Sequence, residues 1–131
     1  MRTALWPETD DAHLDEIARY FAGTLNEPLA VLLACDNDGT PLGFIELNLR
    51  KYAEGCETDR IGYVEGWYVE PHVRRRGIGR ALFAAGETWA RAQGCTEMAS
   101  DTELNNEVSF AAHRALGYEE TDRIICFRKE L

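Results

Sequence analysis

The chain has 131 residues, enough for one domain with a single core and a single cleft, and too few for a second independently folded domain. Its 23 acidic and 14 basic side chains give a formal charge of −9, which argues against unaided binding to nucleic acid or anionic lipid and favours a cationic partner. No apolar run approaches the roughly 20 residues that cross a bilayer. Residues 1–7 carry neither a long apolar core nor a small-residue cleavage site, so we expect a cytoplasmic protein with no membrane partner.

The four cysteines, Cys35, Cys56, Cys95 and Cys126, lie far apart, with no Cys-x-x-Cys pair and no histidine at zinc-finger spacing. We therefore expect free thiols, with no metal site and no disulfide framework. None of them is a candidate nucleophile.

The first predicted element is an amphipathic helix over residues 9–23. Thr9, Asp10 and Asp11 can cap its start, because a short polar side chain accepts a hydrogen bond from the first turn. Apolar residues then recur at helical spacing until Gly23, which is suited to end the helix.

Three strands are predicted next. Residues 29–35 and 41–50 are apolar segments separated by the turn sequence Asp-Asn-Asp-Gly, which is typical of a β-hairpin. Residues 52–60 are polar and contain a glycine, so they predict a loop, and residues 61–69 predict the third strand.

The second half of the chain alternates helices and strands. Apolar spacing predicts a helix over residues 77–93, closed by a glycine, and then a short strand over 95–99. A further helix begins at Asn105 or Asn106 and runs to residue 116, and the last predicted strand covers 121–129. No repeat or linker divides this order, so residues 1–131 predict one α/β or α+β domain.

The junction between strand 61–69 and helix 77–93 carries a basic turn that contains glycines, Arg74-Arg75-Arg76-Gly77-Ile78-Gly79. The first turn of a helix presents unpaired backbone N–H groups and a partial positive charge, and glycine lets a phosphate approach them. Arginine adds bidentate hydrogen bonds to phosphate oxygens. The segment therefore predicts a site for a diphosphate.

Two common phosphate loops do not match this segment. A Walker loop needs a Gly-Lys pair, and the chain contains none. A dinucleotide fold needs a third glycine, at the position that Leu82 occupies. Kinase, nucleotide hydrolase and nicotinamide-binding functions are therefore not expected.

The remaining pattern, Arg-x-x-Gly-x-Gly after a strand and before an amphipathic helix, resembles the acyl-CoA loop of the GNAT superfamily of N-acetyltransferases. The segment from Asn105 to Leu116-Gly117-Tyr118 is similar to the last helix of that family. The resemblance implies the GNAT fold, a mixed and mostly antiparallel central sheet flanked by helices, here expected to lack the usual first strand. It also implies acetyl-CoA as cosubstrate, held by Trp67, Tyr68, Val69, Arg74, Arg75, Arg76, Gly77, Ile78, Gly79, Arg80 and Asn106.

Within that superfamily the chain resembles the bacterial aminoglycoside 6′-N-acetyltransferases over nearly its whole length. The residues that carry this likeness include Leu5-Trp6-Pro7, Glu97-Met98-Ala99-Ser100-Asp101-Thr102 and Leu116-Gly117-Tyr118-Glu119-Glu120-Thr121. The resemblance implies an acetyl transfer to the 6′-amine of an aminoglycoside, a polycation that suits the acidic composition. It also implies a homodimer, in which strand 121–129 pairs across subunits and covers an exposed edge.

Direct transfer needs a neutral amine, a polarised thioester carbonyl and a proton for the departing thiolate. Glu65 is the preferred base, and Asp101 orients the amino sugar and shares that task. His113 stands where many family members have a tyrosine as the general acid, and histidine can donate a proton near neutral pH. By analogy the acceptor site comprises Trp6, Tyr52, Glu65, Asp101 and Glu119.

Each of these residues also has a purely structural interpretation. Glu65, Glu119 and Glu120 can be solvated carboxylates, Asp101 a turn former, His113 a packing residue and Trp6 a cover for the core. Two other functions remain open for the chain as a whole. One is acetylation of a different amine, namely a polyamine, a peptide N-terminus or a lysine, and the other is a non-catalytic acyl-CoA-binding domain.

Overall fold

An open four-stranded sheet forms the middle layer of the computed structural model, which describes the backbone of residues 1–131 and the side chains of residues 1–8 and 12–131. The strands follow the chain order β1 (Ala30–Cys35), β2 (Pro41–Arg50), β3 (Ile61–Val69) and β4 (Glu97–Ser100). The first three strands are antiparallel, and β4 is parallel to β3. The predicted mixed sheet is therefore confirmed.

The hairpin between β1 and β2 shows how the turn sequence acts. One carboxylate oxygen of Asp36 accepts hydrogen bonds from the backbone N–H groups of Asp38 and Thr40, each at 2.9 Å. Gly39 follows with a φ of 81°, a conformation that other residues rarely adopt. The predicted hairpin is confirmed, and its turn is built from local hydrogen bonds.

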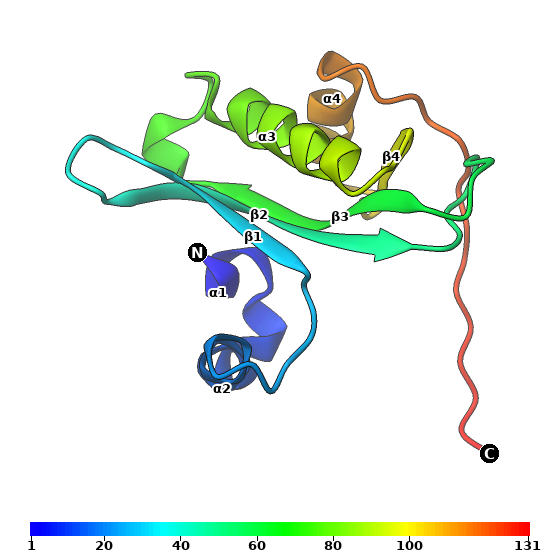
Figure 1. Ribbon diagram of the computed structural model, residues 1–131, viewed down its shortest axis with the longest axis horizontal. Coiled ribbons are helices and arrows are strands. Elements are labelled where there is room, and N and C mark those ends of the chain that lie inside the picture. Colours follow the sequence, from blue (N-terminus) through cyan, green and yellow to red (C-terminus); the bar gives the residue numbers. More distant parts are fainter.

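Helices cover both faces of the sheet (Figure 1). Helix α3 (Ile78–Ala92) packs on one face, where the core is formed by Ile45, Leu47, Val64, Leu82 and Phe83. The other face carries α1 (Arg2–Leu5), the short 3-10 turn η1 (Pro7–Thr9) and α2 (Asp10–Phe21). Helix α2 confirms the first predicted helix, whereas α1 was not predicted. The capping side chains expected at residues 9–11 lie outside the described part.

Helix ends in the second half agree with the predicted caps. Gly94 after α3 and Gly117 after α4 (Glu107–Ala115) have φ values of 84° and 92°. The Asn106 side chain accepts a hydrogen bond from the Ser109 backbone N–H at 3.0 Å and so caps α4. None of the helices in the described part is long and apolar enough to cross a membrane.

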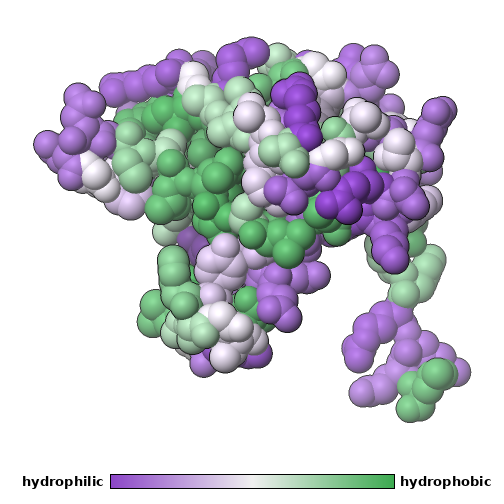
Figure 2. All heavy atoms as spheres, in the orientation of Figure 1, coloured by the Kyte–Doolittle hydropathy of each residue, from purple (hydrophilic) through white to green (hydrophobic). Residues whose placement is uncertain are grey.

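The strand predicted over residues 121–129 is absent from the described chain. This segment is irregular, and it extends away from the body with its apolar side chains uncovered (Figures 1 and 2). Ile125 is 77% and Phe127 is 92% exposed. The apolar residues of this segment do not form a strand alone, because a strand needs a neighbour for its backbone hydrogen bonds. The short strand predicted over 95–99 is present but begins at Glu97.

Candidate active site

The sheet opens where β3 and β4 part. Their pairing runs from Ile61–Glu97 to Val64–Ser100, and β3 then continues to Val69 without its parallel neighbour. The backbone of residues 66–69 stays paired with β2 on the other side. One edge of this stretch therefore has no strand neighbour in the described structure, so its backbone groups can hydrogen-bond a ligand, although the Val69 carbonyl oxygen already accepts a hydrogen bond from Arg74.

The loop that starts α3 lies directly after this edge. Gly77 has a φ of 84°, and a Cβ placed there would meet nothing within 4 Å, so the backbone is open to a ligand. At Gly79 an added Cβ would lie 3.0 Å from the Trp67 ring, which explains the second glycine as a packing requirement. The loop thus has the open space and the glycines that a diphosphate needs.

The arginines of the predicted cofactor loop divide into two groups. Arg74 donates through its Nε to the Val69 carbonyl oxygen at 2.8 Å, and Arg80 donates to the Ala115 carbonyl oxygen at 3.2 Å. Arg74 therefore links the loop to the end of β3, and Arg80 links α3 to the end of the helix over residues 107–115. Arg75 and Arg76 are exposed, and Arg75 has a φ of 61°, unusual for a residue with a side chain.

Glu65, on β3, and Asp101, which directly follows β4, are the first residues after the last β3–β4 pair. Arg50, the last residue of β2, binds Glu65 with two hydrogen bonds, from Nε at 3.2 Å and from Nη2 at 2.7 Å. The Tyr63 hydroxyl donates to Asp101 Oδ2 at 2.8 Å. The Arg50 guanidinium also lies 3.4 Å from the centre of the Tyr63 ring, so the four side chains form one connected network.

Two hollows flank this network. One, of about 1620 Å³, is lined by Asp101 and Glu119 among nine carboxylates, with four arginines. The other, of about 1010 Å³, lies beside α1 and α2 and is lined by Trp6 and Glu65. Arg50 lines both hollows. The excess of carboxylates in the first hollow suits a ligand with several positive charges.

Tyr52, also assigned to the acceptor site from the sequence, is not among the residues that line these two hollows, although its neighbour Ala53 lines the first. It is 71% exposed and belongs to the predicted loop between β2 and β3. The structure thus brings Trp6, Glu65 and Asp101 toward the point where β3 and β4 part and leaves Tyr52 on the surface.

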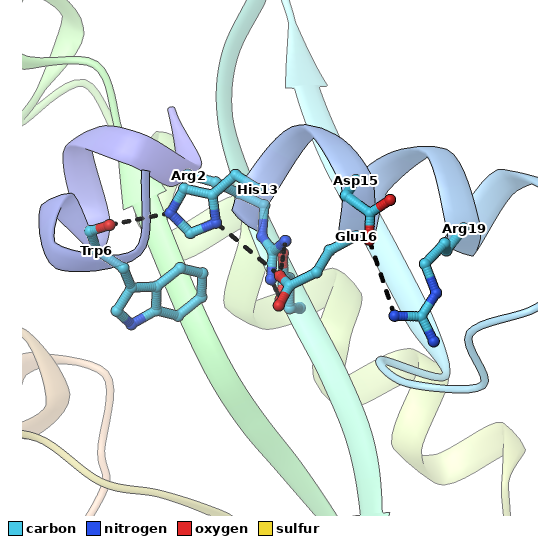
Figure 3. Close-up of polar contacts among 7 residues, drawn as sticks. Arg2, Trp6, His13, Asp15, Glu16 and Arg19 are labelled. Atoms are coloured by element: carbon cyan, nitrogen blue, oxygen red, sulfur yellow. Dashed lines mark hydrogen bonds and ion pairs between the residues drawn. The ribbon is translucent and has the colours of Figure 1, made fainter. Parts of the chain in front are cut away.

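Trp6 owes its position to a glycine and to a cluster of charges. A Cβ on Gly66 would lie 2.4 Å from the Trp6 ring, so the ring occupies the space above that glycine. Arg2 forms ion pairs with Glu46 at 2.7 Å and with Glu16 at 2.9 Å. Figure 3 shows this cluster, in which the His13 ring meets the Trp6 backbone oxygen at 2.9 Å. Burial raises the pKa of the Glu46 carboxyl, and the nearby Arg2 guanidinium offsets only part of that rise.

His113 lies among aromatic rings, edge-on to Phe83, Trp67 and Tyr118. Its Nδ1 is 2.8 Å from the Ser109 carbonyl oxygen, which requires a hydrogen on that nitrogen, so Nε2 of the neutral ring accepts from the Ser100 hydroxyl at 2.9 Å. Both nitrogens of the neutral ring are therefore already engaged. Any proton transfer from this ring must start from its protonated form.

The sequence analysis missed Arg50 and Tyr63. Tyr63 stands two residues before Glu65, a spacing that places side chains on one face of a regular strand. The register shift opposite Glu46 and Leu47 disturbs that alternation, and Arg50 reaches Glu65 only through the pairing of β2 with β3. Of these two residues, only Tyr63 therefore had a signal in the sequence, namely its spacing of two residues from Glu65.

Comparison with known proteins agrees with this geometry. The model of the acetyltransferase (GNAT) family matches residues 1–118. The chain therefore belongs to the acetyltransferase (GNAT) family.

Individual relatives are more specific. Over 132 aligned residues the chain is 50% identical to an aminoglycoside N(6′)-acetyltransferase type 1 of Klebsiella aerogenes, covering 100% of this chain and 87% of that protein. It resembles the structure of AAC(6′)-Iy in complex with the bisubstrate analogue CoA-S-monomethyl-acetylneamine, with a TM-score of 0.88, 39% identity and coverage of 100% and 88%. The aminoglycoside 6′-N-acetyltransferase AAC(6′)-Ih from Acinetobacter baumannii has a TM-score of 0.87, 36% identity and coverage of 99% and 87%.

Proposed function

We propose that this chain transfers the acetyl group of acetyl-CoA to the 6′-amine of aminoglycosides. The observation that carries the proposal is the placement of two carboxylates, Glu65 and Asp101, directly after the last β3–β4 pair, beside an open backbone edge. The likeness to aminoglycoside acetyltransferases along the whole chain supports the choice of acceptor.

The residues present fit acetyl-CoA. The open space at Gly77 and the exposed Arg75 and Arg76 suit a diphosphate, and the free edge near Val69 suits an amide-rich arm. We assign its binding to Trp67, Tyr68, Val69, the loop from Arg74 to Arg80, and Asn106. When bound, this cosubstrate supplies an activated acetyl thioester, and the backbone N–H groups of the edge polarise its carbonyl.

In the reaction the 6′-nitrogen forms a bond to the acyl carbon and the carbon–sulfur bond breaks. Glu65 takes the proton that the nitrogen loses, directly or through water, and Asp101 orients the amino sugar. Arg50 occupies Glu65 through two hydrogen bonds, so the incoming ammonium has to share or replace that contact. An acceptor with several positive charges competes better with Arg50 for the Glu65 carboxylate.

The thiolate has to gain a proton. We assign this step to the protonated His113 ring, which gives its Nε2 proton to the Ser100 hydroxyl while the hydroxyl proton passes to sulfur. The neutral ring has no spare N–H for a direct transfer. Trp6, Tyr52 and Glu119 complete the acceptor site, where aromatic rings pack on the sugar faces and Glu119 binds a further amine.

The test is thioester consumption with a panel of amines at fixed acetyl-CoA. We expect turnover with kanamycin A and much weaker turnover with spermidine, an N-terminal peptide amine or lysine. Turnover with the other amines alone would identify a different acceptor, and cosubstrate binding without any turnover would identify a non-catalytic domain.

The chain acts as a homodimer, in which residues 121–129 of each copy pair with the sheet of the other. The support is the segment's apolar side chains, of which Ile124, Ile125 and Phe127 are exposed. Light scattering of the full chain should give twice the monomer mass, and deletion of residues 121–131 should give a monomer. A fully active full-length monomer would contradict this assignment. Since the enzyme consumes acetyl-CoA, we place it in the cytoplasm.

A further inference from the structure

The proposed reaction does not use the hydroxyl group of Tyr63 directly. The residue is 3% exposed, and its ring sits on β3 within the small core formed with Ala53 and Ile61. Its hydroxyl donates to Asp101 Oδ2 at 2.8 Å. Burial, followed by the hydrogen bond to Asp101, raises the pKa of Tyr63, so the hydroxyl keeps its proton and remains a donor.

The backbone does not hold the two carboxylates of the site together. The last paired residues of β3 and β4 are Val64 and Ser100; Glu65 follows on β3, and Asp101 is the first residue after β4. Past that point the strands part, so the separation of the two carboxylates depends on side chains.

The side-chain connection runs through Tyr63 and Arg50. Arg50 lies 3.4 Å from the centre of the Tyr63 ring and binds both oxygens of Glu65. Tyr63 in turn holds Asp101, which is otherwise exposed. A single buried phenol therefore contacts the Asp101 carboxylate directly and the Glu65 carboxylate through Arg50, and its ring packs with Ala53 and Ile61.

We propose that Tyr63 is a positioning residue for the acceptor, which fixes the Asp101 carboxylate relative to Glu65 across the opening between β3 and β4. This inference rests on the proposed function. It assigns to Tyr63 a role in binding the amino sugar, while acetyl-CoA binding is independent of it.

The test is Tyr63→Phe, which keeps the ring and its contact with Arg50 and removes the hydroxyl alone. We expect the KM for kanamycin A to rise about tenfold, in line with the loss of one hydrogen bond to a charged group. The KM for acetyl-CoA should not change. The matched control is Tyr118→Phe, because the Tyr118 hydroxyl is also buried but has no hydrogen-bond partner among the described residues, and this variant should keep both KM values.

A double-mutant cycle separates positioning from general stability. Kanamycin A binding is measured by calorimetry for the wild type, Tyr63→Phe, Asp101→Ala and the double variant, and Tyr63→Phe should have no effect once Asp101 is absent. An unchanged KM, an equal loss in the Asp101→Ala background, or a parallel loss of acetyl-CoA affinity would overturn the proposal. Wild-type protein that neither binds nor acetylates kanamycin A would overturn the proposed function itself, a result separate from any of these.

Discussion

The cofactor side and the acceptor side of the site are assembled in different ways. Apart from Asn106, the cofactor side is continuous in sequence, since residues 67–80 supply the open strand edge, the basic loop and the start of α3. The acceptor side draws Arg50 from β2, Glu65 from β3, Asp101 from the position after β4 and Trp6 from the end of α1. Local geometry determines the first side, whereas strand pairing and side-chain contacts over long sequence separations determine the second.

This difference predicts which property a mutation on each side of the site changes. A change in the cofactor side should act through backbone conformation and should affect acetyl-CoA binding. A change in the acceptor side should break a side-chain contact and affect turnover or the amino sugar, leaving acetyl-CoA binding intact. Two experiments test this separation, and a third tests the charge cluster beside Trp6.

The largest effect is expected for Glu65→Gln. The amide keeps the shape of the side chain but cannot take a proton, so turnover should fall about 100-fold. Acetyl-CoA affinity, measured by calorimetry, should stay within a factor of two, about the error of that measurement. Equal loss of turnover and cosubstrate affinity, or no loss of either, would remove the assigned role.

A moderate effect is expected for Gly77→Ala in the cofactor loop. Its φ of 84° makes a side chain there unfavourable by about 1–2 kcal/mol, and relaxation of the loop should weaken acetyl-CoA binding. The control is Gly39→Ala in the β1–β2 turn, which has a φ of 81° and the same open surroundings. Urea denaturation should show similar losses of stability in both variants, and calorimetry should show weaker acetyl-CoA binding only in Gly77→Ala. Loss of binding in both would show that the loop has no special role.

The smallest effect concerns Glu46 beneath Trp6. Because burial raises its pKa in the folded protein above the value in the unfolded chain, its contribution to stability is complete at pH values below the unfolded pKa. That contribution is lost as the pH rises through the folded pKa. Glu46→Gln removes this titration, so the stability of the wild type relative to the variant should decline from pH 4 toward pH 7 in urea denaturation.

The control for this experiment is Glu16→Gln, which removes the other carboxylate on Arg2 and leaves Glu46 in place. It should keep the pH trend of the wild type. If the stability of the wild type relative to Glu46→Gln stays constant or grows with pH, the trend cannot be assigned to Glu46.

The sequence predicted the ends of α3 and α4 well because those signals are local. Gly94 and Gly117 have the positive φ values that their positions after these helices suggested, and Asn106 caps α4 as expected. The long strands were equally clear from their apolar runs, and β2 and β3 have the predicted bounds.

The sequence could not predict contacts that depend on register or on a neighbour. The bond between Arg50 and Glu65 exists only because β2 and β3 pair with a shift near Glu46. The helix α1 is a single turn and has too few residues to show a helical period. The strand predicted over residues 121–129 is absent from the described structure, because the apolar residues of that segment contain no information about a neighbour with which it could pair.

The parting of β3 and β4 also bears on how specificity can change. A free strand edge recognises a ligand through main-chain groups, which every residue except proline provides. Those groups therefore stay in place when side chains around the opening are replaced during evolution, provided that the strand itself, the proposed base Glu65 and the close approach of Gly66 to Trp6 are kept. Enzymes built on this opening can acquire new acceptors by changing the surrounding side chains while they continue to use the same acyl donor.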